Sequence, residues 1–233
     1  MRKIQYGIGF LVALCMIVVV LITAFQLGIY GDESFYEKEY RKYRVSKDLD
    51  MEMEDIVDVS GKMMDYLIGK RETLSVLTKI GGEEKDFFNE QDRLHMADVK
   101  ALFLGGLDLR LWCLGLMVVL LGVLIFMKAK LREILPRVWE AAVLATGLLA
   151  AFIGIAAANN FTRVFTKFHE IFFTNDLWML DYANDYMIRM LPEGFFADMT
   201  LRIALIFGGM MLLITAIGIW QQVALRRARK KID

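Results

Sequence analysis

The sequence contains few of the residues that cross-link a chain by disulfides or interrupt its helices. Its 233 residues include two cysteines, two prolines and two histidines. Residues 31–100 and 161–202 contain no cysteine, which excludes a disulfide framework in those segments. Cys15 and Cys113 lie in different apolar runs, and we expect them at different membrane depths, where they would not form a disulfide.

Several motifs that carry common chemistry are also absent. The chain has no Gly-x-Ser-x-Gly elbow, phosphate-binding loop, dinucleotide fingerprint or His-Glu-x-x-His helix, which disfavours serine hydrolases, nucleotide-driven pumps and zinc proteases. The two histidines lack short-range ligand spacing, so a metal site from them and nearby carboxylates is a weak hypothesis. The apolar runs have almost no polar residue at their centres, which disfavours a transporter.

The composition indicates a membrane protein with sizeable aqueous segments. The chain is 57% hydrophobic, yet it carries 28 basic and 28 acidic residues, so the charges must gather in separate segments. Runs of roughly 20 apolar residues can cross a bilayer, and four are present: Ile8–Ile29, Leu111–Met127 with an extension back to Ala101, Val138–Ala158 and Ile203–Trp220. We predict an all-α integral membrane protein, a four-helix transmembrane bundle capped by a mostly helical extracytoplasmic domain.

The distribution of lysine and arginine predicts the orientation of these spans. The first run is longer than the apolar region of a signal peptide, so we interpret it as a retained helix. Basic residues gather at the N-terminus, between the second and third spans, and in the tail, which predicts that both termini are cytoplasmic. The expected parts are spans at 1–30, 101–127, 138–160 and 203–222, extracytoplasmic segments at 31–100 and 161–202, a cytoplasmic loop at 128–137 and a cytoplasmic tail at 223–233.

The first extracytoplasmic segment predicts several short elements. Residues 32–50 are expected to form a solvated juxtamembrane helix whose tyrosines Tyr36, Tyr40 and Tyr43 lie near the lipid headgroups. Residues 50–67 have the apolar spacing of an amphipathic helix. Residues 73–80 are predicted as a strand or extended passage that ends in a Gly81-Gly82 turn.

One histidine lies just before the second span. On a helix, Phe88, Gln91, His95 and Asp98 would share a face, and the helix can continue into the span. A carboxylate three residues away can fix the tautomer of His95 or raise its basicity, although a structural histidine at an interface explains this motif equally well. Asp108 and Arg110 admit two explanations: charges that snorkel to the bilayer edge or polar groups that face the bundle interior.

The other histidine follows the third span, whose many alanines and glycines favour close helix packing. His169 lies in a polar and aromatic segment, residues 168–181, and the four-span topology puts it on the same side of the membrane as His95. Two imidazoles at one interface favour acid–base catalysis of acyl transfer, with asparagine or arginine groups stabilising an oxyanion. The alternative is a non-enzymatic membrane protein that binds a partner or regulates one.

Three segments resemble a known family. The motif Leu94-His95-Met96-Ala97-Asp98-Val99-Lys100 leads into a span, Phe168-His169-Glu170-Ile171-Phe172-Phe173-Thr174-Asn175-Asp176-Leu177-Trp178 follows another, and Leu191-Pro192-Glu193-Gly194-Phe195-Phe196 precedes the last. Together with the four-span layout they are similar to the bacterial lipoprotein intramolecular transacylases. Residues 32–85 contribute little to this resemblance.

The resemblance implies a plasma-membrane enzyme that is active on the outer face. Such an enzyme moves the sn-2 acyl chain of a diacylglyceryl-modified lipoprotein to the α-amino group of the N-terminal cysteine of the same molecule. On matching positions His95 and His169 would be the catalytic pair. The supporting or substrate-binding candidates are Asp98, Arg163, Asn175, Asp176 and Asp181.

The same resemblance bears on cofactors and partners. An O-to-N acyl shift replaces an ester with an amide and needs no nucleotide or metal, so no cofactor is expected. The expected partners are the lipoprotein substrate and membrane lipid, with no nucleic acid, and we expect a monomer.

Overall fold

The computed structural model describes residues 2–229, with side chains described up to residue 224. The elements in chain order are α1 Arg2–Tyr30, α2 Ser34–Lys42, α3 Val45–Leu49, α4 Met53–Leu67, β1 Leu77–Ile80, β2 Glu83–Asp86, α5 Glu90–Phe126, α6 Leu131–Asn159, α7 Phe161–Phe172, α8 Tyr186–Met190 and α9 Glu193–Arg229. They divide into two compact units. The bundle unit comprises Met1–Ile29, Asp108–Ala156 and Arg202–Asp233, and the loop unit comprises Tyr30–Leu107 and Ala157–Leu201.

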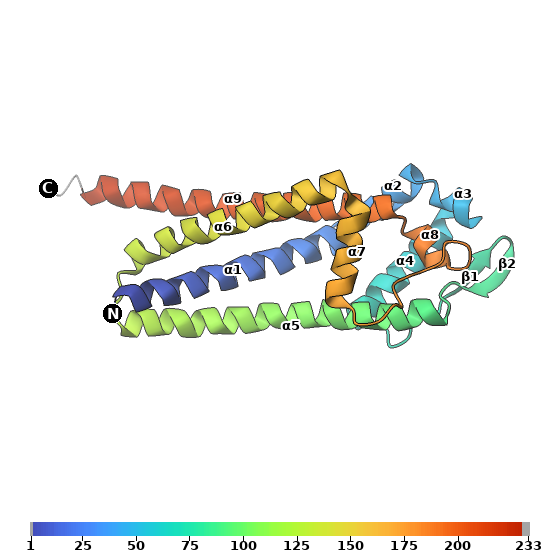
Figure 1. Cartoon of the computed structure of the whole chain (residues 1–233), viewed down its shortest axis with the longest axis horizontal. Helices are drawn as coiled ribbons and strands as arrows, with labels where there is room; N and C mark the ends of the chain where they lie inside the picture. The colour runs from blue at the N-terminus through green and yellow to red at the C-terminus, as the bar shows by residue number, and fades with distance from the viewer. Residues whose placement is uncertain (1, 230–233) are drawn as a thin grey trace. The chain divides into compact units, whose positions relative to one another are not determined.

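The bundle unit consists of long apolar helices that run side by side (Figure 1). Four helices are long and apolar enough to cross a membrane, namely α1, α5, α6 and α9, so the four predicted membrane helices are confirmed. Ala13 and Ile17 of α1 pack with Ala142 of α6 and Met211 of α9 in one buried cluster. Trp139 of α6 also donates a hydrogen bond to Thr215 of α9, over 3.0 Å.

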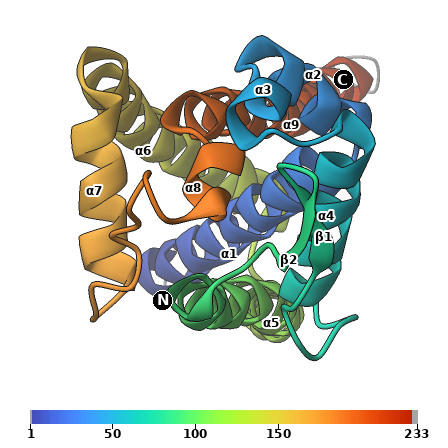
Figure 2. The same ribbon diagram turned by 90° about the vertical axis from the view of Figure 1, so that its right-hand side faces the viewer.

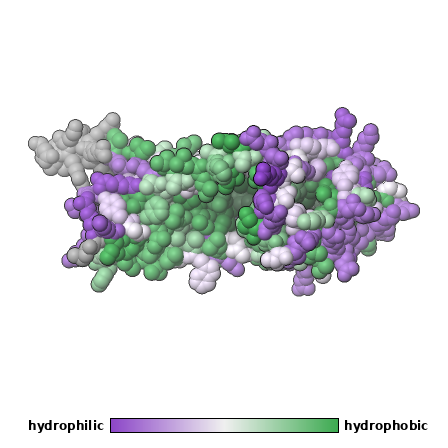
Figure 3. Space-filling view, viewed as in Figure 1, coloured by the Kyte–Doolittle hydropathy of each residue, from purple (hydrophilic) through white to green (hydrophobic). Residues whose placement is uncertain are grey.

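The outer surface of the bundle unit is apolar, and the space-filling view shows this part largely in green (Figure 3). The side chains of Trp112, Phe126 and Phe152 are 77%, 89% and 72% exposed. A continuous apolar surface of this kind is stable where lipid covers it, and helices satisfy their own backbone groups there. The bundle unit is therefore built as a membrane domain.

Three of the helices extend beyond the expected spans. The third begins at Leu131, inside the stretch expected as the cytoplasmic loop 128–137, and it contains Pro136. Pro136 lies in the second turn, where its missing N–H removes one backbone hydrogen bond without ending the helix. The connection before this helix shrinks to a turn at Lys128, which has φ 51°. Helix α5 starts at Glu90 and α9 at Glu193, both earlier than the spans. The expected basic tail residues Arg226, Arg227, Arg229, Lys230 and Lys231 fall outside the described side chains.

The prediction that the two cysteines lie at different membrane depths was wrong. Cys15 and Cys113 are both buried and belong to one cluster with Val12 and Met117. Counting residues from the span ends placed them at different depths, because it ignored how far α5 extends before its apolar part. Both thiols are free.

The loop unit combines short helices with a hairpin, and in Figure 2 the hairpin β1–β2 lies beside α4. Helix α2 packs against α3 and α4, and α8 packs against α3. Tyr36 and Tyr40 are buried, and the Tyr40 ring stacks on Phe195 with centroids 5.9 Å apart. The prediction of a solvated helix with tyrosines at the headgroups is therefore wrong for these two rings, because Phe195 from a distant segment supplies an apolar partner.

Helix α4 and the hairpin follow the sequence pattern more closely. The amphipathic helix is confirmed over Met53–Leu67, with Ile56, Val59 and Met63 buried. Strand β1 and the Gly81-Gly82 turn are also confirmed, and both glycines have positive φ, at 59° and 81°, as a two-residue hairpin turn requires. Strand β2 was not predicted, because its sequence Glu83–Asp86 is charged throughout.

Candidate active site

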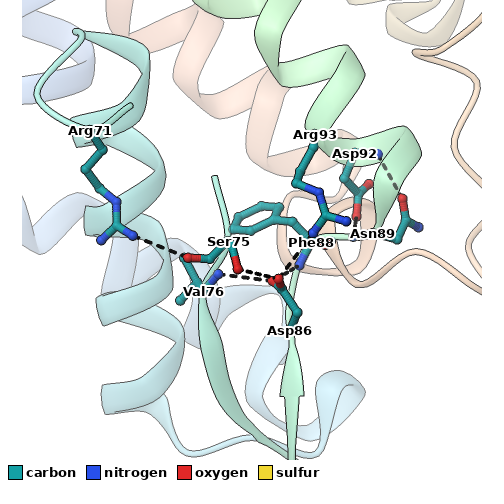
Figure 4. A network of polar contacts seen from close by, with 8 residues as sticks. All are labelled: Arg71, Ser75, Val76, Asp86, Phe88, Asn89, Asp92 and Arg93. Carbon is teal, nitrogen blue, oxygen red and sulfur yellow. Dashed lines mark hydrogen bonds and ion pairs between the residues drawn. The ribbon is translucent and has the colours of Figure 1, made fainter. Parts of the chain in front are cut away.

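The start of α5 is held in place by a network of polar contacts (Figure 4). Asp92 N–H donates to Asn89 Oδ1 over 2.9 Å, and Asn89 N–H donates to Asp92 Oδ2 over 3.1 Å. This reciprocal cap satisfies N–H groups that a helix start leaves without partners. Three residues before Asn89, Asp86 accepts hydrogen bonds from the backbone of Val76 and Phe88. The first turns of α5, which carry His95, are thus tied to the hairpin.

Two buried carboxylates continue this network. Asp92 is fully buried and Asp185 is nearly so. Burial raises the pKa of Asp92 to about 6. Asn89 Nδ2 donates to Asp185 Oδ1, and Asp185 Oδ2 accepts from the backbone N–H of Asp181 over 2.5 Å. These bonds join the start of α5 to the segment that follows α7. Asp92 and Asp185 were missed as candidates, because isolated acids in a charged segment carry no sequence signal of burial.

His95 lies on the part of α5 that precedes the apolar segment beginning at Ala101. It is buried, and its Nδ1 has no hydrogen-bond partner among the described residues. Burial lowers the pKa of His95 to about 4, aided by the nearby His169 and opposed by the charge of Asp98. At neutral pH His95 is therefore a neutral imidazole, which can donate from one nitrogen and accept at the other.

His169 lies on α7, which starts directly after α6 because Asn160 adopts an extended conformation and caps the new helix. Asn160 Oδ1 accepts from the backbone N–H of Arg163 over 2.9 Å. The Nδ1 of His169 lies 2.7 Å from the carbonyl oxygen of Phe165. A carbonyl can only accept, so Nδ1 carries the proton and Nε2 keeps a free lone pair. Burial lowers the pKa of His169, against the opposing effect of this hydrogen bond.

The two imidazoles lie together inside an aromatic enclosure. Their ring centroids are 6.0 Å apart. Phe173 contacts both rings, at 5.3 Å from His95 and 5.6 Å from His169, while Phe165 and Trp178 lie 4.3 Å and 4.9 Å from His169. Phe165 was not predicted, although its i,i+4 spacing to His169 on one helix face was a usable signal. The aromatic rings make the surroundings of the two imidazoles apolar and leave each histidine only 7% exposed.

Two of the other predicted residues meet beside this pair. Asn175 Nδ2 donates to Asp98 Oδ2 over 2.9 Å. Gln91, which the sequence placed on the same face of the helix, donates to the carbonyl oxygens of Leu177 and Met179 over 3.1 Å each. The loop after α7 is therefore laid along the His95 face of α5.

The remaining candidates lie elsewhere. Arg163 and Asp176 are exposed. Asp181 is exposed and bonds within its own turn, where it accepts from Ala183 and Asn184, and the structure brings none of these three side chains to the imidazoles. Asp108 and Arg110 were expected either to snorkel to the bilayer edge or to face the bundle interior. Asp108 is exposed, and Arg110 donates a hydrogen bond to Gln26 over 2.7 Å within the bundle unit.

Comparison with known proteins places this chain in a family. The family model "lipoprotein intramolecular transacylase Lit" matches residues 10–196. An uncharacterised protein of Aquifex aeolicus is 27% identical over 212 residues, which cover 87% of this chain and 92% of that protein.

Solved structures agree with the fold. The lipoprotein intramolecular transacylase Lit of Bacillus cereus has a TM-score of 0.78 and 20% identity, with 98% of this chain and 100% of that chain covered. The same enzyme with a histidine replaced by alanine has a TM-score of 0.73 and 19% identity, with 97% of each chain covered. At this identity the likeness shows the fold, while the family match covers most of the sequence. The chain therefore belongs to the lipoprotein intramolecular transacylase family, and it is a membrane enzyme rather than a non-enzymatic partner-binding protein.

Proposed function

We propose that the enzyme moves the sn-2 acyl chain of a diacylglyceryl-modified lipoprotein onto the α-amino group of the N-terminal cysteine of the same molecule, giving a lyso-form lipoprotein. The observation that carries this proposal is the pair of buried, neutral imidazoles with centroids 6.0 Å apart inside the aromatic enclosure. Two adjacent bases in an apolar site suit a reaction that moves one proton from nitrogen to oxygen.

The two histidines have different roles. The nitrogen of the cysteine attacks the ester carbonyl as His169 Nε2 takes a proton from it, since Nδ1 of His169 is held by the Phe165 carbonyl. His95 positions the ester and donates its N–H proton to the glycerol oxygen as the carbon–oxygen bond breaks, while its other nitrogen accepts the proton that His169 has taken, so His95 stays neutral. The net change is one new amide, one broken ester and one proton moved from nitrogen to oxygen.

The remaining rate enhancement comes from holding the two reacting groups together. Both belong to one substrate molecule, and a well-oriented intramolecular reaction gains up to about 7–11 kcal/mol over its bimolecular counterpart. The rings of Phe165, Phe173 and Trp178 pack around the histidines, and we infer that they fold the acyl chains back toward the cysteine. No acyl-enzyme is needed in this scheme.

We also propose the orientation that the basic segments indicate. The turn and helix start between α5 and α6 contain Lys128, Lys130 and Arg132, so this end of the bundle unit is assigned to the cytoplasm together with both termini. The histidines then work on the outer face of the plasma membrane, in a monomer. Accessibility of single cysteines introduced at Lys130 and at Lys62 to a membrane-impermeant reagent tests this assignment: only the second should be labelled in intact cells.

A labelled lipopeptide tests the reaction itself. A diacylglyceryl cysteinyl peptide with a deuterated acyl chain at sn-2 is incubated with the purified protein, and the product is sequenced by mass spectrometry. The proposal expects the deuterated chain on nitrogen, and no exchange of chains when labelled and unlabelled substrates of different peptide sequence are mixed. Label retained on glycerol, or crossover between peptides, contradicts it.

A further inference from the structure

The carboxylate of Asp98 has no cationic partner although it lies next to the histidine pair. It is half-buried, and one oxygen, Oδ2, accepts a hydrogen bond from Asn175 over 2.9 Å. Among residues 2–224, no hydrogen bond reaches its Oδ1 and no lysine or arginine forms an ion pair with it. A half-buried carboxylate oxygen that no group of the described residues contacts is open to a hydrogen-bond donor from outside the chain.

The nearest basic residue along the helix is committed elsewhere. Lys100 donates to the carbonyl oxygen of Arg71 over 3.0 Å and its ammonium lies 4.1 Å from the centre of the Tyr66 ring. The negative charge of Asp98 acts on His95 instead, where it opposes the effect of burial.

Asn175 fixes the direction in which the carboxylate points. Its Oδ1 accepts from the backbone N–H of Leu177 over 3.1 Å, so its Nδ2 is turned to Asp98. Residues on either side of Asn175 contact the imidazoles, since Phe173 packs on both and Trp178 packs on His169. Asp98 is thus held within the same small arrangement of groups as the two histidines.

We propose that Asp98 binds the α-ammonium group of the N-terminal cysteine of the substrate before the reaction. A primary ammonium is a compact cation with three donors, and it matches a carboxylate oxygen that has no partner. The bound ammonium releases one proton to solvent, and the resulting amine gives a second proton to His169 as it attacks the ester. This inference rests on the proposed function for the identity of the substrate, and it makes Asp98 a substrate-binding residue rather than an acid or base.

Binding of non-reacting analogues tests the proposal without any turnover. The probes are two lipopeptides in which ether bonds replace both esters, one with a free α-amine and one with an N-acetyl group, and each displaces a fluorescent lipopeptide from the full-length protein in nanodiscs. A charge-assisted hydrogen bond is worth about 1.5–3 kcal/mol, so the wild type should bind the free amine at least about tenfold more tightly than the N-acetyl analogue. Asp98→Asn should bring this ratio close to one, and Asp98→Glu should retain most of it.

The controls separate the possible failures. Asp58→Asn makes the same chemical change on an exposed residue of α4 that pairs with Lys62, and it should leave the ratio unchanged. A wild-type ratio near one overturns the proposal whatever the variants do, as does a ratio that Asp98→Asn leaves intact. The ether analogues do not react, so their binding is independent of acyl transfer. If acyl transfer fails while the binding ratio is tenfold, the proposed reaction is contradicted and the ammonium site is still supported.

Discussion

The bundle unit and the loop unit bury different kinds of side chain. In the bundle unit the most buried residues are apolar and often small, such as Ala24, Leu124 and Ala142. The six buried polar or charged residues of the described chain all lie in the loop unit: Glu39, Ser60, Asp92, His95, His169 and Asp185. Burying an ionisable group is expensive unless it is paired or used. The bundle unit is therefore suited to lipid, and the loop unit contains the buried ionisable groups, including both candidate histidines.

The largest expected effect comes from removing either histidine. His95→Gln and His169→Gln should each lower the rate of acyl transfer by about 10²- to 10⁴-fold, the usual contribution of a general acid or base. Cys113→Ala in the bundle unit should leave the rate within about twofold, since surface and core changes remote from a site rarely affect chemistry. Product formation from a lipopeptide measures both. Activity retained in both histidine variants would contradict the acid–base assignment.

Truncating a phenylalanine should reduce stability much more in the loop unit than in the bundle unit. Phe88 is fully buried in the loop unit, whereas Phe126 is 89% exposed on the bundle unit. Phe88→Ala should cost about 3–5 kcal/mol, and Phe126→Ala should cost little because lipid surrounds that ring in either case. The shift in thermal unfolding midpoint in one detergent measures the difference. Equal shifts would show that the two surfaces are not packed as described.

A smaller effect is expected from adding one methyl group at a glycine. A Cβ on Gly194 would lie 2.4 Å from Cε1 of Tyr43, whose hydroxyl is bonded to Asp198 over 2.5 Å and cannot easily move. Gly194→Ala should therefore destabilise the loop unit by about 1–3 kcal/mol. A Cβ on Gly154 meets nothing within 4 Å, so Gly154→Ala is the matched control, with little or no expected change. Thermal unfolding of the two variants tests the pair.

A further expected effect is a pH dependence of stability from His95. Its folded pKa is about 4, below the reference value of about 6.5, so the unfolded chain binds the proton more readily between these values. The contribution of neutral His95 is complete above pH 6.5 and is lost as the pH falls toward 4, by at most about 1.4 kcal/mol per unit.

Asp92 works in the opposite direction. Its folded pKa is raised to about 6, so its contribution is present at low pH and is lost as the pH rises through 6. The comparison must therefore be between wild type and His95→Gln at each pH, with Asp92 present in both. The stability of the wild type should fall faster than that of the variant from pH 6.5 to 4. Parallel curves would show that His95 is not held neutral by the fold.

Much of the bundle unit was predictable, and less of the loop unit was. Uninterrupted apolar runs identify membrane helices, because a helix needs about 20 apolar residues to cross the hydrocarbon core of a bilayer. The pattern could not show that α6 begins at Leu131 or that Cys15 and Cys113 pack in one cluster. In the loop unit Tyr36 and Tyr40 looked like interface anchors, and their burial depends on Phe195, which is far away in the sequence.

The candidate site divides in the same way. His95 and His169 are the only histidines in the chain, and the four-span topology placed both on one side. Asp98 and Asn175 were also predicted, and the structure joins them by a hydrogen bond. Asp92 and Asp185 were not, since only the fold reveals that their carboxylates are buried. Arg163, Asp176 and Asp181 had the right chemistry for a site, but nothing local in the sequence told whether they face it.

The sequence by itself determined whether each segment lies in lipid or in water and which chemical groups are available, because hydropathy and residue identity are local properties. It determined that the chain has four membrane helices and that both histidines lie near the ends of these spans. Only the tertiary structure decided which groups meet. It sets the 6.0 Å between the imidazole centroids and the hydrogen bond from Asn175 to Asp98. These depend on contacts between segments distant along the chain, where a shift of one residue turns a side chain to another face.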